Sequence, residues 1–584
     1  MVVTTTSSMA IRLKRAVIVI FGFVNCFMFF ALLQVVDKQT IKSYSVDLIQ
    51  NKLNRYVFHA PTSAPLDAAD KVRLPLNSAL VWGKIDNLHK ALPAYEKMRA
   101  VYSNLRDYRP VFLRKASSAR ISRDMLRYKS IMNEGNVDRL REIFSDVLHT
   151  NRSIKIGIVG GTYSSEKIYC KKESCLYFDV VVRWLQQIIG VDVVVHNAAL
   201  RYATSDYFAW CLSPHLDALD MDIIIWELAT EDYIMRDTFG KTGFDNPARP
   251  QEELTRQILT LSNKPFLMYF GLLSSRSVRH RECVNSEYFA GRHLSKYYNV
   301  TVISWATAVC SRLWRTGFTP IDLVYTDNQL SPFAHSQGAL FIINYMRNIL
   351  ETVSLDEMNK TQSDERHINK LIAKHDAFLK NSKSNAPARH HRVQRDLSPT
   401  NNSTKGSQST LNSTMVKSGV VRQHLPKPKF CGNLLKYPLC WPASNPQFEP
   451  KHKLTFSIND GWEPDFSERE NWFTSTEPNQ QISFPISVGL SPDNLTTTIA
   501  ITMITCTYCG QALVWLDNHF EGANLVNSYG NDHMMVVRPV LYGVTPGDHV
   551  VRIKNMEEKP FKLAAIMTTY EHNMTANYCV GRWW

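Results

Sequence analysis

Apolar residues in the first half of the chain fall into short continuous runs, with helical patterns between them. The run Ile156–Val159 ends in Gly160 and Gly161, and Thr162 follows. A continuous apolar run is typical of a parallel strand that is buried on both faces, and adjacent glycines indicate a tight turn after it. Further runs occur at Val191–His196, Met221–Trp226, Pro265–Phe270 and Val300–Trp305, with helical stretches at Tyr288–Tyr298 and Ala339–Leu350. The alternation predicts an α/β domain with a parallel sheet.

From about residue 430 the pattern changes to short strands that are separated by turn residues. Thr545-Pro-Gly-Asp548 lies just before one strand, where proline fixes φ and glycine supplies a positive φ. Strands are expected at Leu454–Ile458, Gln481–Val488, Thr496–Thr507, Ala512–Leu516, Met534–Val540, His549–Ile553 and Phe561–Thr569. Strands without helices predict a β-sandwich. Tryptophans that either fill its core or stack on sugars are Trp462, Trp472, Trp515, Trp583 and Trp584.

The segments outside these two regions divide the chain further. Helical patterning covers 86–148 and includes a predicted helix at Leu126–Leu148, within a stem and helical lead-in. Residues 353–425 are rich in Asn, Ser, Thr and Lys and have few aromatic residues. Such a stretch cannot bury a core, which predicts a disordered linker. The expected order is a cytosolic tail (1–15), a transmembrane anchor (16–36), the stem and lead-in (37–144), the α/β domain (145–352), the glycosylatable linker (353–429) and the sandwich (430–584).

Ala16–Val36 carries no charge and is long enough to span a bilayer, which takes about 20 residues. Arg12, Lys14 and Arg15 precede it, and no small-residue cleavage site is evident. Basic residues before a span remain in the cytosol. These features predict a type II protein of the secretory pathway, in the Golgi or alternatively at the cell surface, with a luminal C-terminus.

Glycosylation and processing signals fit that orientation. N-x-S/T triplets begin at Asn151, Asn299, Asn359, Asn401, Asn402, Asn412, Asn494 and Asn573. Within the linker, Arg392-Val-Gln-Arg395 fits a minimal R-x-x-R cleavage site in an exposed segment. One interpretation of this stretch is a solvated basic linker. The other is a processing site whose cleavage releases the C-terminal part of the chain.

The cysteines beyond the span are expected to be mostly disulfide-bonded in an oxidising lumen. They fall in two groups, Cys170, Cys175, Cys211, Cys283 and Cys310 in the α/β region and Cys431, Cys440, Cys506, Cys509 and Cys579 in the sandwich. Because each group holds an odd number, either a disulfide joins the two domains or each domain keeps a free thiol. Cys506-Thr-Tyr-Cys509 has redox or zinc spacing, but no second pair accompanies it, so a structural role is favoured.

The 584 residues include 44% hydrophobic ones, which predicts a globular chain of two or more domains. The net charge of +14 is spread along the sequence, and no basic helix with interleaved aromatic residues occurs. Nucleic-acid binding is therefore disfavoured. No motif calls for a cofactor or a metal ion.

The order of blocks over 145–352 resembles that of the SGNH (GDSL-type) hydrolases. The family's first and last blocks are similar to Lys155–Ser164 and Thr326–His335, and Glu227–Asp232 is similar to a variant of its Asn-Asp block. The resemblance implies a three-layer SGNH/flavodoxin-like domain with its site at the carboxyl edge of the sheet. Residues 544–553 resemble the closing hairpin of jelly-roll modules, many of which bind carbohydrate.

In active members of that family a Ser attacks an ester, a His removes its proton, and a Ser amide, a Gly amide and an Asn side chain hold the oxyanion. At the matching positions this chain has Thr162 for Ser, Glu231 for Asn and Gln329 for His. Thr326 stands in place of the family's Asp, and Ala199 or Leu200 lies near the position of the family's Gly. Further candidates at the site are Gly161, Ser164, Ser165, Asn197, Asp327 and His335.

These replacements remove known catalytic functions. Gln329 cannot act as a general base near neutral pH. An ionised Glu231 about 3 Å from an oxyanion would repel it by roughly 5 kcal/mol at an effective dielectric constant near 20. The extra methyl group of Thr162 crowds the attack. A shifted register could instead recruit Ser164 or Ser165, with Asp327 and His335.

Three functional hypotheses follow. The first is a luminal glycoprotein whose degenerate SGNH-like domain binds glycans or acylated polysaccharides, or supports a partner enzyme. The second is an active carbohydrate esterase or O-acetyltransferase with a nonstandard catalytic constellation. The third is a surface recognition protein that is released by cleavage at Arg395.

Overall fold

The computed structural model places an α/β domain and an all-β domain within one compact unit, Val81–Trp584. The residues that it describes are 78–165, 175–239, 248–273, 291–313, 329–384, 425–426, 428–429, 435–443, 453–465, 472–490 and 496–571.

The α/β domain is built on a mostly parallel sheet, as the apolar runs predicted. Its parallel strands are β2 (Ile154–Gly160), β3 (Val193–Asn197), β4 (Ile223–Glu227), β5 (Phe266–Gly271) and β6 (Thr301–Ser304). Their spatial order is β3-β2-β4-β5-β6, the flavodoxin-like order that the resemblance implied. A short strand, β1 (Ile131–Asn133), pairs antiparallel with β6 at the edge.

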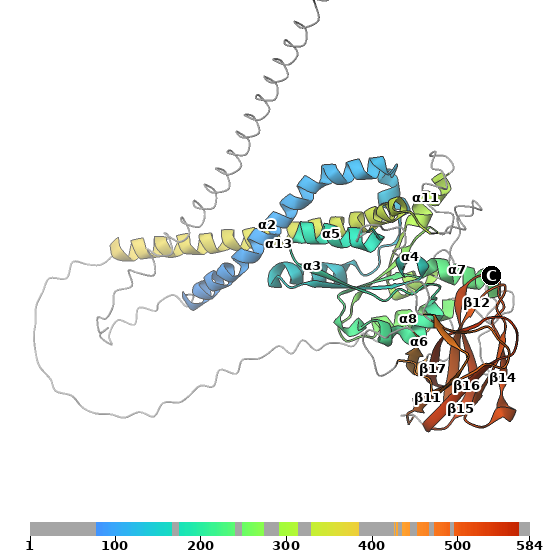
Figure 1. Cartoon of the computed structure of the whole chain (residues 1–584). Helices are drawn as coiled ribbons and strands as arrows, with labels where there is room; N and C mark the ends of the chain where they lie inside the picture. Colours follow the sequence, from blue (N-terminus) through green and yellow to red (C-terminus); the bar gives the residue numbers. More distant parts are fainter. Residues whose placement is uncertain are drawn as a thin grey trace, which may run out of the picture. The chain divides into compact units, whose positions relative to one another are not determined.

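Helices cover both faces of this sheet (Figure 1). Alternate residues of β4 show the division, because Ile225 belongs to one core and Trp226 to the other. The first core is completed by α2 (Ser78–Ser118), α3 (Val137–Thr150), α5 (Tyr177–Ile189), α11 (Trp305–Leu313) and α13 (Pro332–Ser384). The second includes α6 (Ser205–His215), α7 (Ala229–Phe239), α8 (Ala248–Leu259) and α10 (Arg292–Tyr298). Short helices are α4 (Thr162–Ser165), η1 (Met125–Lys129) and η2 (Ala218–Asp220).

The single helix predicted at Leu126–Leu148 is wrong. The structure breaks this segment into η1, β1 and α3. Gly135 has a φ of +65°, and a Cβ atom there would overlap the main chain of Thr301 on β6. The close approach to β6 ends the helical pattern, and Asn136 starts α3 by accepting a hydrogen bond from the Arg139 amide.

The predicted linker also begins too early. Helix α13 continues from the α/β domain to Ser384, well past the expected boundary at residue 353. Val353 is buried in the first core and Met358 packs against it, while the Gln362 amide donates to the Tyr95 hydroxyl at 3.3 Å. Tertiary contacts therefore keep a polar sequence helical. The remainder of the predicted linker lies mostly outside the described residues.

The all-β domain, orange to red in Figure 1, is a sandwich of two antiparallel sheets. One sheet contains β15 (Met534–Val544), β12 (Thr496–Thr505), β17 (Phe561–Glu571), β10 (Trp472–Ser475) and β9 (Glu463–Asp465), with β7 (Lys436–Pro442) paired to β17. The other contains β14 (Asn524–Asn527), β13 (Gln511–Leu516), β16 (Gly547–Asn555), β11 (Gln481–Val488) and β8 (Ile458–Asp460). A short helix, η6, spans Phe520–Gly522. The β-sandwich prediction is confirmed, although β7, β9, β10 and β14 were not foreseen.

The sandwich shares a core with the α/β domain. Ile501 on β12 faces the other sheet of the sandwich, whereas Ala500 belongs to the core that contains α6. The Met535 amide donates to the Tyr202 carbonyl at 2.9 Å, and Cys211 on α6 is disulfide-bonded to Cys440 on β7. One sheet of the sandwich is thus buried on both faces.

The disulfide between Cys211 and Cys440 confirms the bridge between the two domains that the odd cysteine numbers allowed. Cys506 and Cys509 are bonded to each other, which favours the structural role over a zinc site. Cys175 is also disulfide-bonded. The other predicted disulfide cysteines lie outside the described side chains, and they are Cys170, Cys283, Cys310, Cys431 and Cys579.

The sugar-stacking role considered for the sandwich tryptophans is not supported by their positions. Trp462, Trp472 and Trp515 are 2%, 1% and 5% exposed, so they fill the core and cannot stack on a ligand from solvent. Trp583 and Trp584 lie outside the described residues.

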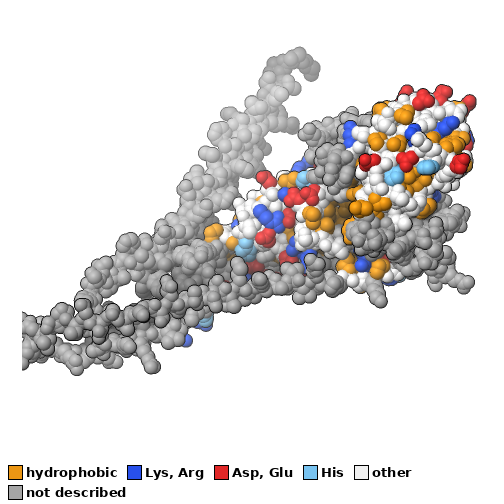
Figure 2. All heavy atoms as spheres, turned by 90° about the horizontal axis from the view of Figure 1, so that it is seen from below, with side chains coloured by type: hydrophobic (Ala, Val, Ile, Leu, Met, Phe, Trp, Pro, Cys, Tyr) orange, Lys and Arg blue, Asp and Glu red, His pale blue; other side chains and the backbone are white. Residues whose placement is uncertain are grey.

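In the part of the chain that the structure describes, no helix has the length and apolar character needed to cross a bilayer. The predicted span Ala16–Val36 and the processing site Arg392–Arg395 both lie outside that part. Among the sequons, Asn151, Asn299 and Asn359 are exposed, as glycosylation requires. The sequons outside the described residues are Asn401, Asn402, Asn412, Asn494 and Asn573. On the described part of the face drawn in Figure 2, acidic and basic side chains are interspersed with hydrophobic ones.

Candidate functional site at the carboxyl edge of the sheet

The site expected from the sequence lies where β2 and β4 end, at the edge of the sheet where α/β folds bind ligands. Strand β2 ends at Gly160, and Thr162 is the first residue of the short helix α4. Strand β4 ends at Glu227, and Glu231 lies in the first turn of α7. Parallel pairing of the two strands therefore brings Thr162 and Glu231 together, although they are 69 residues apart.

Glu231 binds the group that would form the oxyanion hole in an active hydrolase. The main-chain N–H of Thr162 donates to Oε1 of Glu231 at 2.7 Å. A helix leaves its first N–H groups without internal partners, so a carboxyl group in this position caps α4. The amide that resembles the family's oxyanion donor is thus occupied by a side chain of the same protein.

Gly161 makes room for that carboxyl group. Its own amide donates to the Glu227 carbonyl at 3.0 Å, which holds the turn against β4. A Cβ atom at position 161 would overlap the carboxyl carbon of Glu231. Glycine is required here because Glu231 packs directly on the main chain, and not only because the turn is tight.

Burial raises the pKa of Glu231 to about 7, and the hydrogen bond from the Thr162 amide offsets only part of this effect. Its second oxygen, Oε2, is buried and has no hydrogen-bond partner among the described residues. Burial also raises the pKa of Asp232 to about 6, against the hydrogen bonds from Ser205 and Gln251. The carboxyl group of Glu231 is therefore protonated in about half of the molecules near neutral pH.

The other main-chain donors at this edge are also occupied within the protein. The Ala199 amide donates to the Asn197 side chain at 3.1 Å, and the Leu200 amide donates to the Gly160 carbonyl at 3.1 Å. The Tyr202 amide donates to the Thr162 hydroxyl at 3.1 Å. The two amides considered for the family's Gly position thus both have partners, and so does the nucleophile position.

Ser164, the alternative nucleophile, is fully buried. Its hydroxyl donates to Oε2 of Glu227 at 2.7 Å and lies 3.1 Å from the Tyr177 hydroxyl. The Asn197 side chain donates to the Ser164 carbonyl at 3.0 Å. A buried hydroxyl held by Glu227 supports the end of β2 and cannot reach a substrate from solvent, so Ser164 does not supply a nucleophile here. The Ser165 hydroxyl, the other candidate of the shifted register, is half-buried and donates to the Thr162 carbonyl at 3.1 Å.

His335 lies against Tyr177 and not against a nucleophile. The two rings stack with centroids 6.3 Å apart, and Nδ1 of His335 is buried without a hydrogen-bond partner among the described residues. Burial lowers the pKa of His335 to about 4, so the ring is neutral at pH 7. Gln329 is also buried, just before α13. Thr326 and Asp327 lie outside the described residues.

Sequence reasoning missed two contributors to this site. Glu227 is fully buried and holds Ser164, and its signal was a charged residue that ends the apolar run of β4. Tyr202 binds the Thr162 hydroxyl through its main chain, and a main-chain contact leaves no signal in the residue type. Among the described residues, no group of three or more His, Cys, Asp or Glu side chains could hold a metal ion.

No family model and no curated protein matches the chain. Among solved structures, a two-domain esterase described as active on acetylated mannans shares 13% identity, with 76% of this chain and 98% of the esterase covered and a TM-score of 0.46. A lipase/acylhydrolase from Enterococcus faecalis shares 14% identity, with 33% and 96% covered and a TM-score of 0.25. The esterase EstA from Pseudoalteromonas sp. shares 15% identity, with 33% and 97% covered and a TM-score of 0.24.

The chain has a flavodoxin-like α/β domain followed by an all-β sandwich. Because the identities and TM-scores are low, the fold assignment rests on the strand order β3-β2-β4-β5-β6.

Proposed function

We propose that the chain is a luminal, membrane-anchored glycoprotein whose SGNH-like domain has lost ester hydrolysis and binds glycans or supports their modification. One observation carries the loss of chemistry: the carboxyl group of Glu231 occupies the Thr162 amide that would hold an oxyanion. A hydrolase stabilises the charge that develops in its transition state, and this site places an acidic group where that charge would form.

The residues at and near the family's general-base position support the same conclusion. Gln329 cannot take a proton from Thr162, and His335 stacks on Tyr177 with a pKa lowered by burial to about 4. A buried imidazole with a pKa of about 4 is a weak base, and no hydroxyl group among the described residues hydrogen-bonds the His335 side chain.

Two features support the proposed compartment and ligand. Disulfides between Cys211 and Cys440 and between Cys506 and Cys509 are stable in the oxidising secretory pathway, which suits the predicted type II anchor and a Golgi location. The resemblance to SGNH hydrolases, many of which act on acetylated polysaccharides, suggests a glycan ligand. A partner enzyme that acts on the bound glycan fits this proposal.

Hydrolysis of p-nitrophenyl acetate and of acetylated oligosaccharides by the purified full chain tests the proposal. We expect rates within a few fold of buffer, and no change when Thr162→Ala is introduced. Turnover that is well above buffer and is lost in Thr162→Ala would show that the domain is an enzyme.

The alternative of an active esterase or O-acetyltransferase has one observation in its favour. A pKa of about 7 lets part of the Glu231 population carry a proton, and a protonated carboxyl group can donate a hydrogen bond to an oxyanion. Such a site would still need a base, so the activity assay above decides between the two functions.

The third hypothesis, release of a recognition protein at Arg395, meets a covalent constraint. Cys211 and Cys440 lie on opposite sides of the predicted linker, so cutting at Arg395 leaves the sandwich attached to the α/β domain. On a denaturing gel, we expect chain that is cut at Arg395 to run as one band without reductant and as two bands with it. Separation without reductant would restore the release hypothesis.

A further inference from the structure

One exposed aromatic residue of the sandwich, Tyr508, lies on a turn whose ring contacts lead toward the candidate site. Tyr508, between the two cysteines of the Cys506–Cys509 disulfide, is 51% exposed, and its ring contacts His533 with centroids 5.8 Å apart. The ring of His533 contacts Tyr202 at 5.5 Å. Because the Tyr202 amide donates to the Thr162 hydroxyl, two ring contacts and one main-chain hydrogen bond connect the sandwich turn to the sheet edge.

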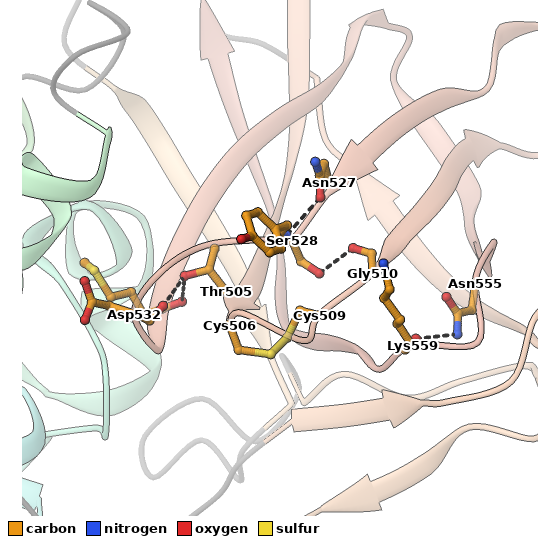
Figure 3. The surroundings of a disulfide bond; sticks show 11 residues. Thr505, Cys506, Cys509, Gly510, Asn527, Ser528, Asp532, Asn555 and Lys559 are labelled. Atoms are coloured by element: carbon orange, nitrogen blue, oxygen red, sulfur yellow. Dashed lines mark hydrogen bonds between the residues drawn. A yellow bond between two sulfur atoms is a disulfide. The ribbon is translucent and has the colours of Figure 1, made fainter.

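A disulfide and several hydrogen bonds brace the turn that carries Tyr508, and Figure 3 draws the Cys506–Cys509 disulfide and the hydrogen bond between Ser528 and Gly510. The Cys506 amide donates to the Ser528 carbonyl at 3.2 Å, and the Gly530 amide donates to the Cys506 carbonyl at 3.1 Å. The Ser528 hydroxyl donates to the Gly510 carbonyl at 2.7 Å. A ring that is fixed before binding loses little conformational entropy when a ligand stacks on it.

A second tyrosine lies beside this turn. The main chain of Tyr529 pairs with Cys506, and the Tyr529 side chain is 56% exposed. Single exposed hydrophobic residues need no explanation, but here two tyrosines lie on paired main-chain segments, and ring contacts lead from Tyr508 through His533 to Tyr202. We call Tyr508, Tyr529, His533 and Tyr202 the tyrosine ledge.

The surroundings of the ledge are polar and carry both signs of charge. Asn527 and Asn531 are exposed beside Tyr529. Two cations and one acid act on His533, namely Lys562, Arg201 and Asp532. Both cations already lie over aromatic rings of the protein, Arg201 over Tyr202 at 4.6 Å and Lys562 over Trp472 at 5.0 Å. A stable protein interface buries about 800 Å² of surface per partner, more than two half-exposed tyrosines present, and an anionic ligand would need cations that the protein's own rings do not already hold.

We propose that the tyrosine ledge is a binding subsite for a chain of neutral pyranose sugars, which extends the candidate site onto the sandwich. Aromatic rings accept the C–H faces of pyranoses, and neighbouring amide side chains hydrogen-bond their hydroxyl groups. This proposal rests on the glycan-binding function proposed above and names the surface that performs it. The buried tryptophans are not needed for this binding, because Tyr508 and Tyr529 present the accessible rings.

Calorimetric titration of the purified full chain with mannopentaose, cellopentaose, xylopentaose and chitopentaose tests the ledge. We expect at least one of these sugars to bind, and Tyr508→Ala to weaken that binding roughly 3- to 10-fold, the range of an aromatic contact. Tyr529→Ala should weaken it as well. Tyr508→Phe keeps the ring and should retain most of the affinity.

Tyr542→Ala is the matched control, because Tyr542 is also 51% exposed but lies near the other end of β15 from His533. We expect no change in affinity for this variant, and unchanged thermal unfolding for all four variants. Binding by the wild type that survives both Tyr508→Ala and Tyr529→Ala would overturn the ledge and leave glycan binding intact. No binding of any of the four sugars by the wild type would overturn glycan binding and the ledge with it.

Discussion

The carboxyl edge of the α/β sheet and the turn edge of the sandwich treat their functional groups in opposite ways. At the sheet edge, the Thr162 amide and hydroxyl are held by Glu231 and Tyr202. At the sandwich edge, the same kind of main-chain bracing leaves Tyr508 and Tyr529 about half exposed. One edge uses its donors to stabilise itself, and the other keeps its rings available to a ligand.

The difference is what we expect if the sheet edge has kept its fold and lost ester hydrolysis, as proposed above. A free oxyanion hole leaves polar groups partly unsatisfied until substrate arrives, which costs stability. Glu231 satisfies the Thr162 amide permanently but leaves its own Oε2 buried without a partner. The exposed tyrosines at the sandwich edge bury no unpaired polar atom, because their rings and hydroxyl groups remain hydrated until a ligand binds.

Restoring the family's residues at the sheet edge should have the largest effect. Thr162→Ser, Glu231→Asn, Thr326→Asp and Gln329→His together supply the usual nucleophile, oxyanion donor and base. We expect p-nitrophenyl acetate hydrolysis to rise by roughly 10²-fold or more, because a base and an oxyanion donor each contribute at least about that factor.

Each single change should leave hydrolysis near the buffer rate, because these groups act as a unit. If a single change gave activity equal to that of the combined variant, the proposal that several groups at the sheet edge must be restored together would be wrong.

The pH dependence of stability should show the buried Glu231 directly. Its pKa is about 7 in the folded state and near 4.5 in the unfolded state, so the folded protein binds the extra proton between these values. The free energy of unfolding should therefore fall as pH rises from about 4.5 to 7, by roughly 3 kcal/mol from this group alone.

Urea unfolding of the wild type and of Glu231→Gln at several pH values isolates that contribution. Asp232 and Glu253, whose pKa values are also raised by burial, remain in both proteins, so the difference between the curves reports Glu231 together with its interaction with Asp232. Parallel curves for the two proteins would mean that Glu231 titrates like an exposed carboxyl group.

Gly161→Ala tests the close packing of Glu231 on the main chain. The added Cβ overlaps the Glu231 carboxyl carbon and should displace it from the Thr162 amide, at a cost of about 1–3 kcal/mol. In a Glu231→Ala background the same substitution should cost much less, and the two changes should be non-additive by about 1 kcal/mol or more in urea unfolding. Additive costs would place the strain of Gly161→Ala elsewhere.

At the sandwich edge we expect the smallest effect. Replacing Cys506 and Cys509 together by Ser keeps Tyr508 but loosens its turn, which should lower the affinity for the bound pentasaccharide roughly 2- to 5-fold through lost preorganisation. The affinity is measured by calorimetry and compared with that of Tyr508→Ala, which shows how much the ring itself contributes. An affinity equal to that of the wild type would show that the hydrogen bonds to Ser528 fix the turn without the disulfide.

Local patterns predicted the strands well and the long helices poorly. Strand β11 has the bounds Gln481–Val488 that its alternation predicted, because its side chains alternate between the sandwich core and more exposed positions. The expected helix at Leu126–Leu148 failed because Gly135 packs on β6, and α13 exceeded its prediction because its later residues pack on the α/β core. Contacts between distant segments decided both outcomes.

The sequence by itself determined which chemical groups this protein lacks. Gln329 cannot be a base and Thr162 is a crowded nucleophile whatever the fold, because these are properties of the side chains. The odd cysteine numbers allowed a bridge between domains but could not choose Cys211 and Cys440, which are 229 residues apart.

Only the tertiary structure decided where Glu231 acts. Its carboxyl group meets the Thr162 amide because β2 and β4 lie side by side in the sheet, and its pKa rises because that meeting place is buried. The same packing places Trp472 in a core and leaves Tyr508 on the surface. Burial depends on what the rest of the chain places around a residue, so no local pattern could specify it.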